Sequence, residues 1–152
     1  HLLEAAPAVH DMEQKERHDE AQHRRDATGD GRDGEDIVEA GKAYGLPKPV
    51  AVGFSNGANI AAAILLLRPE ALSGAILLRA MVPLAKPPQA ALAQTPVLIV
   101  SGASDPIIPA SNAKRLATML KDANADVTHE TLPTGHNLTQ NDVTLATKWL
   151  NR

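Results

Sequence analysis

A Gly-x-Ser-x-Gly pentapeptide between two apolar runs constrains the fold of this chain more than any other feature. The pentapeptide is GFSNG at residues 53–57, preceded by PVAV at residues 49–52 and followed by ANIAAAILL at residues 58–66. This pattern predicts a strand over 50–53 and a helix over 56–67. A serine at a sharp turn between a strand and a helix exposes its hydroxyl over the end of the sheet. The context therefore predicts a nucleophile elbow at Ser55.

The two glycines of the pentapeptide have a steric interpretation. A sharp turn at Ser55 leaves little room for side chains two residues to either side, so we expect both Gly53 and Gly57 to supply that room. The helix that follows would present free backbone N–H groups and the positive end of its dipole, which favour an oxyanion. The alternative for Ser55 is an ordinary helix N-cap.

The composition fits one globular domain and excludes several classes of function. The 152 residues are 43% hydrophobic, and a formal net charge of −3 gives no basic surface for nucleic acid. Without cysteine the chain has neither disulfides nor thiolate metal ligands. No apolar stretch is long enough to span a membrane and no signal peptide is visible, so we expect a cytoplasmic protein.

Residues 1–34 differ in composition from the rest of the chain. Almost nothing apolar occurs from Glu13 to Gly34, so this segment is expected to be solvated or poorly ordered. Its histidines alternate with aspartates but follow no recognised ligand spacing, so no metal site is predicted there. These histidines are His1, His10, His18 and His23. The predicted organisation is a polar segment over 1–34 and a folded domain over 35–152.

From Asp36 onward, helical and strand patterns alternate. We expect helices over 36–44, 56–67 and 111–120, a last helix capped by Thr139 and Asp142, and strands over 50–53, 74–78, 97–100 and 126–131. The proline-rich and alanine-rich residues 81–95 are expected to cross the surface or to line a substrate pocket. Strands that alternate with helices predict a mainly parallel sheet in a three-layer α/β fold. Ligand sites in such sheets lie beyond the C-terminal ends of the strands.

Two further candidates for chemistry follow strands of the predicted sheet. A serine hydroxyl needs a neighbouring base, and the base needs an orienting acid. Asp105 follows the strand over 97–100 and His136 follows the strand over 126–131. Both should therefore converge with Ser55 at one edge of the sheet.

Other interpretations of these two residues remain open. Asp105 precedes a proline and would also fit a simple Asx turn, while His136 would also fit a surface loop. Asp122 and Asp126 are the substitutes for the acid, but both flank the end of a predicted helix. The substitute for the base is His129, which lies within a predicted strand and so should point to a face of the sheet.

Three motifs together resemble the α/β-hydrolase superfamily, specifically its small carboxylesterase/phospholipase-type branch. They are GFSNG at 53–57, GASDPIIP at 102–109 and GH at 135–136, in the Ser, Asp, His order of that superfamily. The resemblance covers about residues 36–152. It implies that Ser55 is the nucleophile, His136 the general base and then acid, and Asp105 its orienting partner. The N–H of Asn56 would be one oxyanion donor.

The resemblance implies a serine carboxylesterase that hydrolyses small, uncharged acyl esters through an acyl-enzyme, with no metal or organic cofactor. An apolar pocket would be lined by Phe54, Met81 and its neighbours up to residue 84, Ile107 and Ile108. Within enzymes, a thioesterase or a lysophospholipase is the nearest alternative. From another class, the alternative is a truncated, weakly active or inactive hydrolase-like domain that serves as a binding module.

The N-terminal part of the chain departs from the family pattern. A complete member has several strands before the elbow and a loop, often with a His-Gly motif, that gives the second oxyanion N–H. Residues 1–34 contain no such motif, so the front of the sheet is expected to be missing or replaced, and the elbow strand to have an open edge. Because an open edge pairs readily with other strands, we expect residues 1–34 to cover it or two copies of the chain to associate there.

Overall fold

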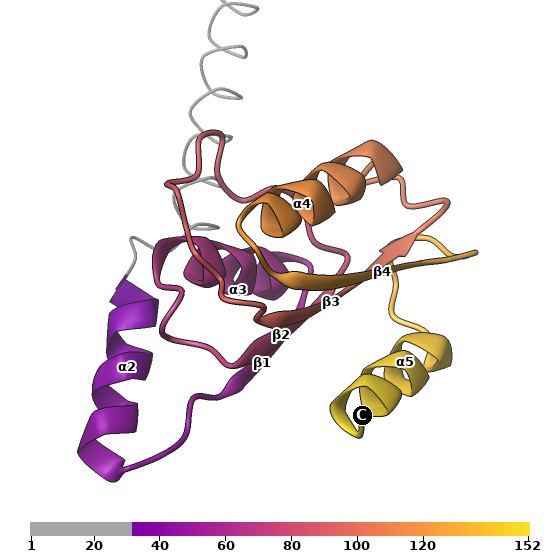
Figure 1. Ribbon diagram of the computed structural model, residues 1–152. Coiled ribbons are helices and arrows are strands. Elements are labelled where there is room, and N and C mark those ends of the chain that lie inside the picture. The colour runs from indigo at the N-terminus through magenta and orange to yellow at the C-terminus, as the bar shows by residue number, and fades with distance from the viewer. Residues whose placement is uncertain (1–31) are drawn as a thin grey trace, which may run out of the picture.

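The computed structural model describes residues 32–152. The predictions that residues 1–31 are poorly ordered, hold no metal site and cover the sheet edge therefore concern residues outside the described range. The same holds for His1, His10, His18 and His23. Four helices and four strands make up the described part (Figure 1). They are α2 (Arg32–Tyr44), β1 (Val50–Phe54), α3 (Asn56–Leu67), β2 (Gly74–Leu78), β3 (Pro96–Gly102), α4 (Ala110–Asp122), β4 (Asp126–Leu132) and α5 (Gln140–Leu150).

The four strands form one parallel sheet in the order β1-β2-β3-β4. Phe54 pairs with Leu78 at the end of β1, and β3 and β4 run on together to the pair of Gly102 and Leu132. All four strands therefore end on the same edge of the sheet. The prediction of a mainly parallel α/β fold is confirmed.

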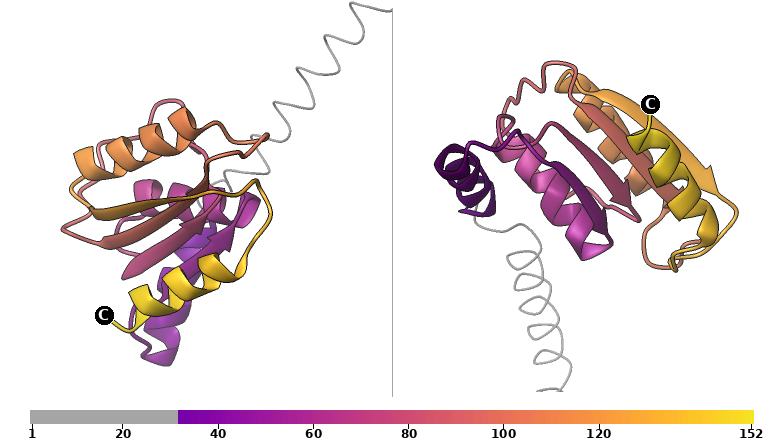
Figure 2. Two further views of the ribbon diagram at one scale, coloured as in Figure 1. Left: turned by 90° about the vertical axis from the view of Figure 1, so that its right-hand side faces the viewer. Right: turned by 90° about the horizontal axis from the view of Figure 1, so that it is seen from below.

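Helices cover both faces of the sheet, which gives three layers (Figure 2). Helices α3 and α4 pack on one face and α5 on the other. Successive residues of β2 and β3 therefore point into two different cores, and the two sets are Ala75, Leu77, Val97 and Ile99 on the first face and Ile76, Leu78, Leu98 and Val100 on the second. Since both faces are buried, these strands read as continuous apolar runs.

Helix α2 begins earlier than the sequence pattern indicates. It starts at Arg32, so the boundary predicted between residues 34 and 35 falls inside a helix. The first turn packs closely on the end of α3, because a Cβ at Gly34 would lie 2.7 Å from Cγ of Arg68, and Glu35 forms an ion pair with Arg68. The other end is as predicted, since Gly45 has a φ of 63° and terminates the helix.

Strand β1 lies at the edge of the described sheet and pairs only with β2 within it. Val50 and Val52 are 41% and 59% exposed. The expectation that the elbow strand has an open edge is met for residues 32–152. None of the helices in this range is long and apolar enough to cross a membrane.

Candidate active site

Ser55 occupies the tight turn between β1 and α3 in a strained backbone conformation. Its φ is 52° and its ψ is −115°, values that residues with a side chain rarely adopt. Its backbone N–H donates to the carbonyl oxygen of Leu78 at 2.8 Å, and its side chain forms no capping hydrogen bond with α3. Ser55 therefore has the geometry of an elbow rather than of an ordinary N-cap.

Only the first glycine of the pentapeptide is sterically required. A Cβ at Gly53 would lie 2.5 Å from the backbone nitrogen of Ala58 and 2.5 Å from the carbonyl carbon of Gly57. Within residues 32–152, a Cβ at Gly57 would meet no heavy atom within 4 Å beyond its chain neighbours and the backbone of its own helix. The expectation that both glycines supply room is thus wrong for Gly57, because only Gly53 lies against backbone atoms at the start of the helix.

Ser55, His136 and Asp105 form a hydrogen-bonded chain at the C-terminal edge of the sheet. The distance from His136 Nε2 to Ser55 Oγ is 3.0 Å, and that from His136 Nδ1 to Asp105 Oδ2 is 2.8 Å. The ring of Phe54 lies beside the imidazole, with 5.4 Å between the centroids. The structure therefore brings together the three residues that the motifs single out, in the order that nucleophilic catalysis needs.

The carboxylate of Asp105 is fixed from both of its oxygens. Oδ1 accepts the backbone N–H groups of Ile107 at 2.8 Å and Ile108 at 2.9 Å, while Oδ2 faces His136. Oδ1 thus forms the Asx turn, and Oδ2 is left to bind the imidazole. Burial alone would raise the pKa of Asp105, but the hydrogen bonds from Ile108, His136 and Ile107 outweigh it, and the pKa lies below its usual 3.8.

The loops that carry Asp105 and His136 are held against each other by their backbones. The N–H of Ala103 donates to Leu132 at 2.8 Å, and that of Ser104 donates to Thr134 at 3.0 Å. A Cβ at Gly102 would collide with the carbonyl oxygens of Thr134 and Gly135. The close approach of these two loops sets the position of Asp105 relative to His136.

The substitute residues lie elsewhere. His129 Nε2 is 2.9 Å from Oγ of Ser101, so it bonds across β3 and β4 and not to Ser55. Asp122 ends α4, and Asp126 begins β4 opposite Pro96. These two carboxylates therefore lie at the N-terminal end of β4, whereas Ser55 follows the C-terminal end of β1.

The predicted substrate-binding residues differ in their exposure. Phe54, Met81 and Ile107 are 38%, 37% and 64% exposed, so they present apolar surface. Ile108 is only 5% exposed, and its backbone N–H binds Asp105. The turn that holds Asp105 directs the side chain of Ile108 into the protein. Ile108 therefore offers little surface to a substrate, although the sequence led us to expect it in the lining of a pocket. Asn56 is the first residue of α3, where a helical N–H has no intrahelical acceptor.

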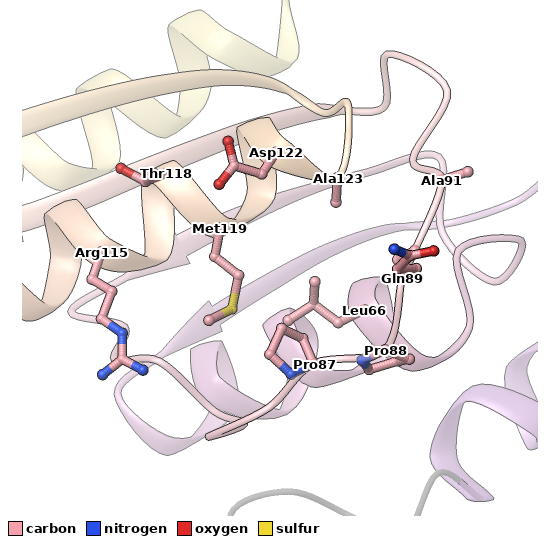
Figure 3. A pocket seen from close by; sticks show the side chains of 11 residues that line it. Leu66, Pro87, Pro88, Gln89, Ala91, Arg115, Thr118, Met119, Asp122 and Ala123 are labelled. Atoms are coloured by element: carbon pink, nitrogen blue, oxygen red, sulfur yellow. The ribbon is translucent and has the colours of Figure 1, made fainter.

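Two cavities in the described part of the chain lie apart from this constellation. One, of about 850 Å³, separates α4 from the proline-rich crossing (Figure 3) and is lined by Leu66, Pro87, Pro88, Gln89, Ala90, Ala91, Arg115, Thr118, Met119, Asp122 and Ala123. The other, of about 440 Å³, lies between α2 and the segment before β1. Neither is lined by Ser55, Asp105 or His136.

Sequence reasoning missed Arg79, which follows β2 and is 1% exposed. Its guanidinium forms an ion pair with Asp142, with Nη1 2.7 Å from Oδ1. Burial alone would raise the pKa of Asp142, but hydrogen bonds from Arg79 and Thr139 outweigh it, and the pKa lies below 3.8. The only sequence signal was a lone charge directly after the apolar run of residues 74–78, where the strand pattern predicts burial.

The lowered pKa values predict a loss of stability in acid. A carboxylate with a folded-state pKa below 3.8 stabilises the fold above the unfolded pKa, and that contribution is lost as pH falls through the folded value. The free energy of unfolding, measured in urea at a series of pH values, should therefore fall steeply below about pH 4.

The matched variant for this prediction is Asp142→Asn. It should be less stable than the unmodified chain by about 3 kcal/mol at pH 7, because a buried pair loses one partner. Its stability should depend less on pH below about pH 4, since one titrating group is gone. If the free energy of unfolding fell equally steeply with pH in both proteins, the lowered pKa would not belong to Asp142.

Comparison of the sequence with known proteins finds hydrolases. The sequence profile of a family described as Phospholipase/Carboxylesterase matches residues 11–152. A Bacillus subtilis (strain 168) protein named "Putative hydrolase MhqD" is 38% identical over 100 residues, which are 66% of this chain and 50% of that protein.

Solved structures agree in fold. A carboxylesterase from Bacillus cereus has a TM-score of 0.73 and 40% identity over 78% of this chain and 57% of its own. One from Mesorhizobium loti has a TM-score of 0.70 and 33% identity over 76% of this chain and 56% of its own. Arabidopsis thaliana SOBER1, at 22% identity and a TM-score of 0.69 over 80% of this chain and 61% of its own, shows the fold alone. The chain spans about half the length of the curated relative and less than two thirds of these structures.

Proposed function

Since the chain belongs to the phospholipase/carboxylesterase family, we propose that it is a serine carboxylesterase that hydrolyses small, uncharged acyl esters through Ser55, His136 and Asp105. The observation that carries the proposal is the continuous hydrogen-bonded chain from Ser55 Oγ through the imidazole to Asp105, with 3.0 Å and 2.8 Å at its two links. The strained elbow under Ser55 supports it, because strain of this kind persists where it exposes a nucleophile.

The geometry suits a two-step acyl transfer. His136 Nε2 takes the proton of Ser55 as Oγ attacks the ester carbonyl carbon, and the imidazolium then protonates the departing alcohol. His136 Nε2 then takes a proton from a water molecule as that water attacks the acyl-enzyme, and the imidazolium returns the proton to Ser55 Oγ as the acid is released. Asp105 accepts the Nδ1–H of His136 and stabilises the imidazolium, while the N–H of Asn56 donates to the oxyanion.

Apolar side chains near the serine favour an uncharged acyl group. The Phe54 ring stands 5.4 Å from the His136 ring, and Ile107 follows Asp105 by two residues and is 64% exposed. An apolar surface suits a short acyl chain better than a charged phosphate. The carboxylesterase names of the Bacillus cereus and Mesorhizobium loti proteins support the same class of substrate.

Substrate preference tests this proposal. Hydrolysis of p-nitrophenyl acetate and butyrate should exceed that of an acyl thioester and of a lysophospholipid by about tenfold or more in kcat/KM, because the exposed side chains of Phe54 and Ile107 offer apolar contact to a short, uncharged ester. Rates are measured beside a Ser55→Ala control, whose residual rate defines the background. A preference for the thioester or the lysophospholipid would identify the chain as a thioesterase or a lysophospholipase instead. Rates equal to those of Ser55→Ala on all four substrates would contradict an esterase.

The edge position of β1 favours a second candidate, a hydrolase-like domain that acts as a binding module with little or no catalysis. Strand β1, which ends directly before Ser55, lies at the edge of the described sheet and pairs only with β2 within it. A serine-directed fluorophosphonate separates the two candidates, because phosphonylation of Ser55 requires a working base while a binding module stays unlabelled.

A further inference from the structure

Arg79 places a buried cation behind the loop that carries His136. It directly follows β2, has a φ of 55°, and donates its backbone N–H to the carbonyl oxygen of Val100 at 2.9 Å. The residue is 1% exposed, so its guanidinium is removed from water. A buried guanidinium needs a partner for each of its donors, and those partners show what it holds in place.

Two of these partners are the carbonyl groups on either side of His136. Nε donates to the carbonyl oxygen of Gly135 at 3.0 Å, and Nη2 donates to that of Asn137 at 3.1 Å. One rigid, planar group therefore fixes the backbone immediately before and immediately after the histidine. A flexible ammonium would not hold two carbonyls in a defined relative orientation in this way.

The remaining donors of Arg79 keep the guanidinium itself in place. Nη1 and Nη2 bind the two oxygens of Asp142 at 2.7 Å and 2.9 Å, and Nη1 also donates to Val100 at 3.3 Å. With the two loop carbonyls this makes five hydrogen bonds for the five N–H donors of an arginine. Asp142 is held in turn by the N–H and hydroxyl of Thr139, each at 2.8 Å, at the start of α5.

We propose that Arg79 is a positioning residue for His136, holding the imidazole in line with both Ser55 and Asp105. This inference rests on the proposed esterase function. The two links of the catalytic chain are 3.0 Å and 2.8 Å long, and both depend on the backbone position of one loop residue. A displacement of about 1 Å in such a constellation lowers the rate about 10²-fold. Arg79 touches neither Ser55 nor the reacting atoms, so it acts through the loop.

The test is Arg79→Lys, with Thr139→Val as the matched control. Lysine keeps a charge for Asp142 but has no planar fork for the carbonyls of Gly135 and Asn137, so kcat should fall about 10²-fold with little change in KM. Thr139→Val removes a hydrogen bond from the same network and leaves every contact of Arg79 intact, so its kcat should stay within about twofold of the unmodified chain.

Proton NMR of His136 gives a readout that does not require turnover. The Nδ1 proton shared with Asp105 should give a low-field resonance in the unmodified chain and in Thr139→Val, and should be lost or broadened in Arg79→Lys at a temperature where all three are folded. A structural role alone would leave this resonance in place. Wild-type kcat together with an unchanged resonance in Arg79→Lys would overturn the proposal.

A second variant covers the case in which Arg79→Lys does not fold. The double variant Arg79→Met, Asp142→Leu replaces the buried pair by apolar side chains, an exchange that many proteins tolerate, and should show the same loss of kcat and of the resonance. Should the unmodified chain prove inactive, the esterase proposal fails while the resonance still decides the role of Arg79: its loss in the variant supports positioning, and its persistence contradicts it.

Discussion

Replacing Ser55 by alanine should lower the turnover of p-nitrophenyl butyrate by about 10⁴-fold or more, to the background rate. The methyl group cannot form an acyl-enzyme, so the two-step route is lost altogether. The side chain of Ser55 forms a hydrogen bond with His136 and none with the helix that follows. The free energy of unfolding should therefore change by less than about 1 kcal/mol.

The measurement for this prediction is a progress curve at matched protein concentration, with urea unfolding of both proteins as the control. Loss of turnover in a protein of unchanged stability assigns the chemistry to the hydroxyl. Retained turnover in Ser55→Ala would mean that another group performs the hydrolysis. The roles proposed for Ser55, His136 and Asp105 would then be wrong.

Replacing Gly53 by alanine should destabilise the chain by about 3 kcal/mol and abolish activity. The added Cβ would lie 2.5 Å from backbone atoms of Gly57 and Ala58, which cannot move without opening the turn under Ser55. Because these are backbone atoms at the start of a buried helix, side-chain rearrangement cannot relieve the clash.

Gly57→Ala is the matched control for that substitution. An added Cβ at residue 57 meets no heavy atom of residues 32–152 within 4 Å outside the backbone of its own helix, and alanine favours a helix over glycine. The stability should therefore change by less than about 1 kcal/mol. Urea unfolding of the two variants gives the comparison. Equal stabilities for Gly53→Ala and Gly57→Ala would show that the elbow is less tightly packed than its geometry indicates.

The fold could be predicted from the sequence where the burial of a strand on both faces requires apolar residues. Strands β2 and β3 are buried on both faces, so they required apolar residues at every position and could be read directly. The positions of Ser55, Asp105 and His136 followed from the parallel order of the strands. Each lies just beyond the C-terminal end of a strand, and in a parallel sheet these ends meet at one edge.

The features that could not be predicted depend on contacts between residues far apart in the chain. Arg79 is joined to Asp142, 63 residues away, and a single sequence gives no sign of that pairing. The roles of Gly53 and Gly57 differ because the backbone angles at Ser55 turn only one of them against the helix. The burial of Ile108 follows from the turn around Asp105, which the Asx pattern suggested without showing where the side chain would point.

Labelling with a fluorophosphonate, followed by mass spectrometry of the peptide that contains residue 55, tests the central claim most directly. Phosphonylation needs the serine, its base and the orienting carboxylate to work together, and it needs no knowledge of the natural substrate. The structure predicts one covalent adduct on Ser55 in the unmodified chain and none in Ser55→Ala. An unlabelled chain, or equal labelling of both proteins, would contradict a functional Ser55–His136–Asp105 triad.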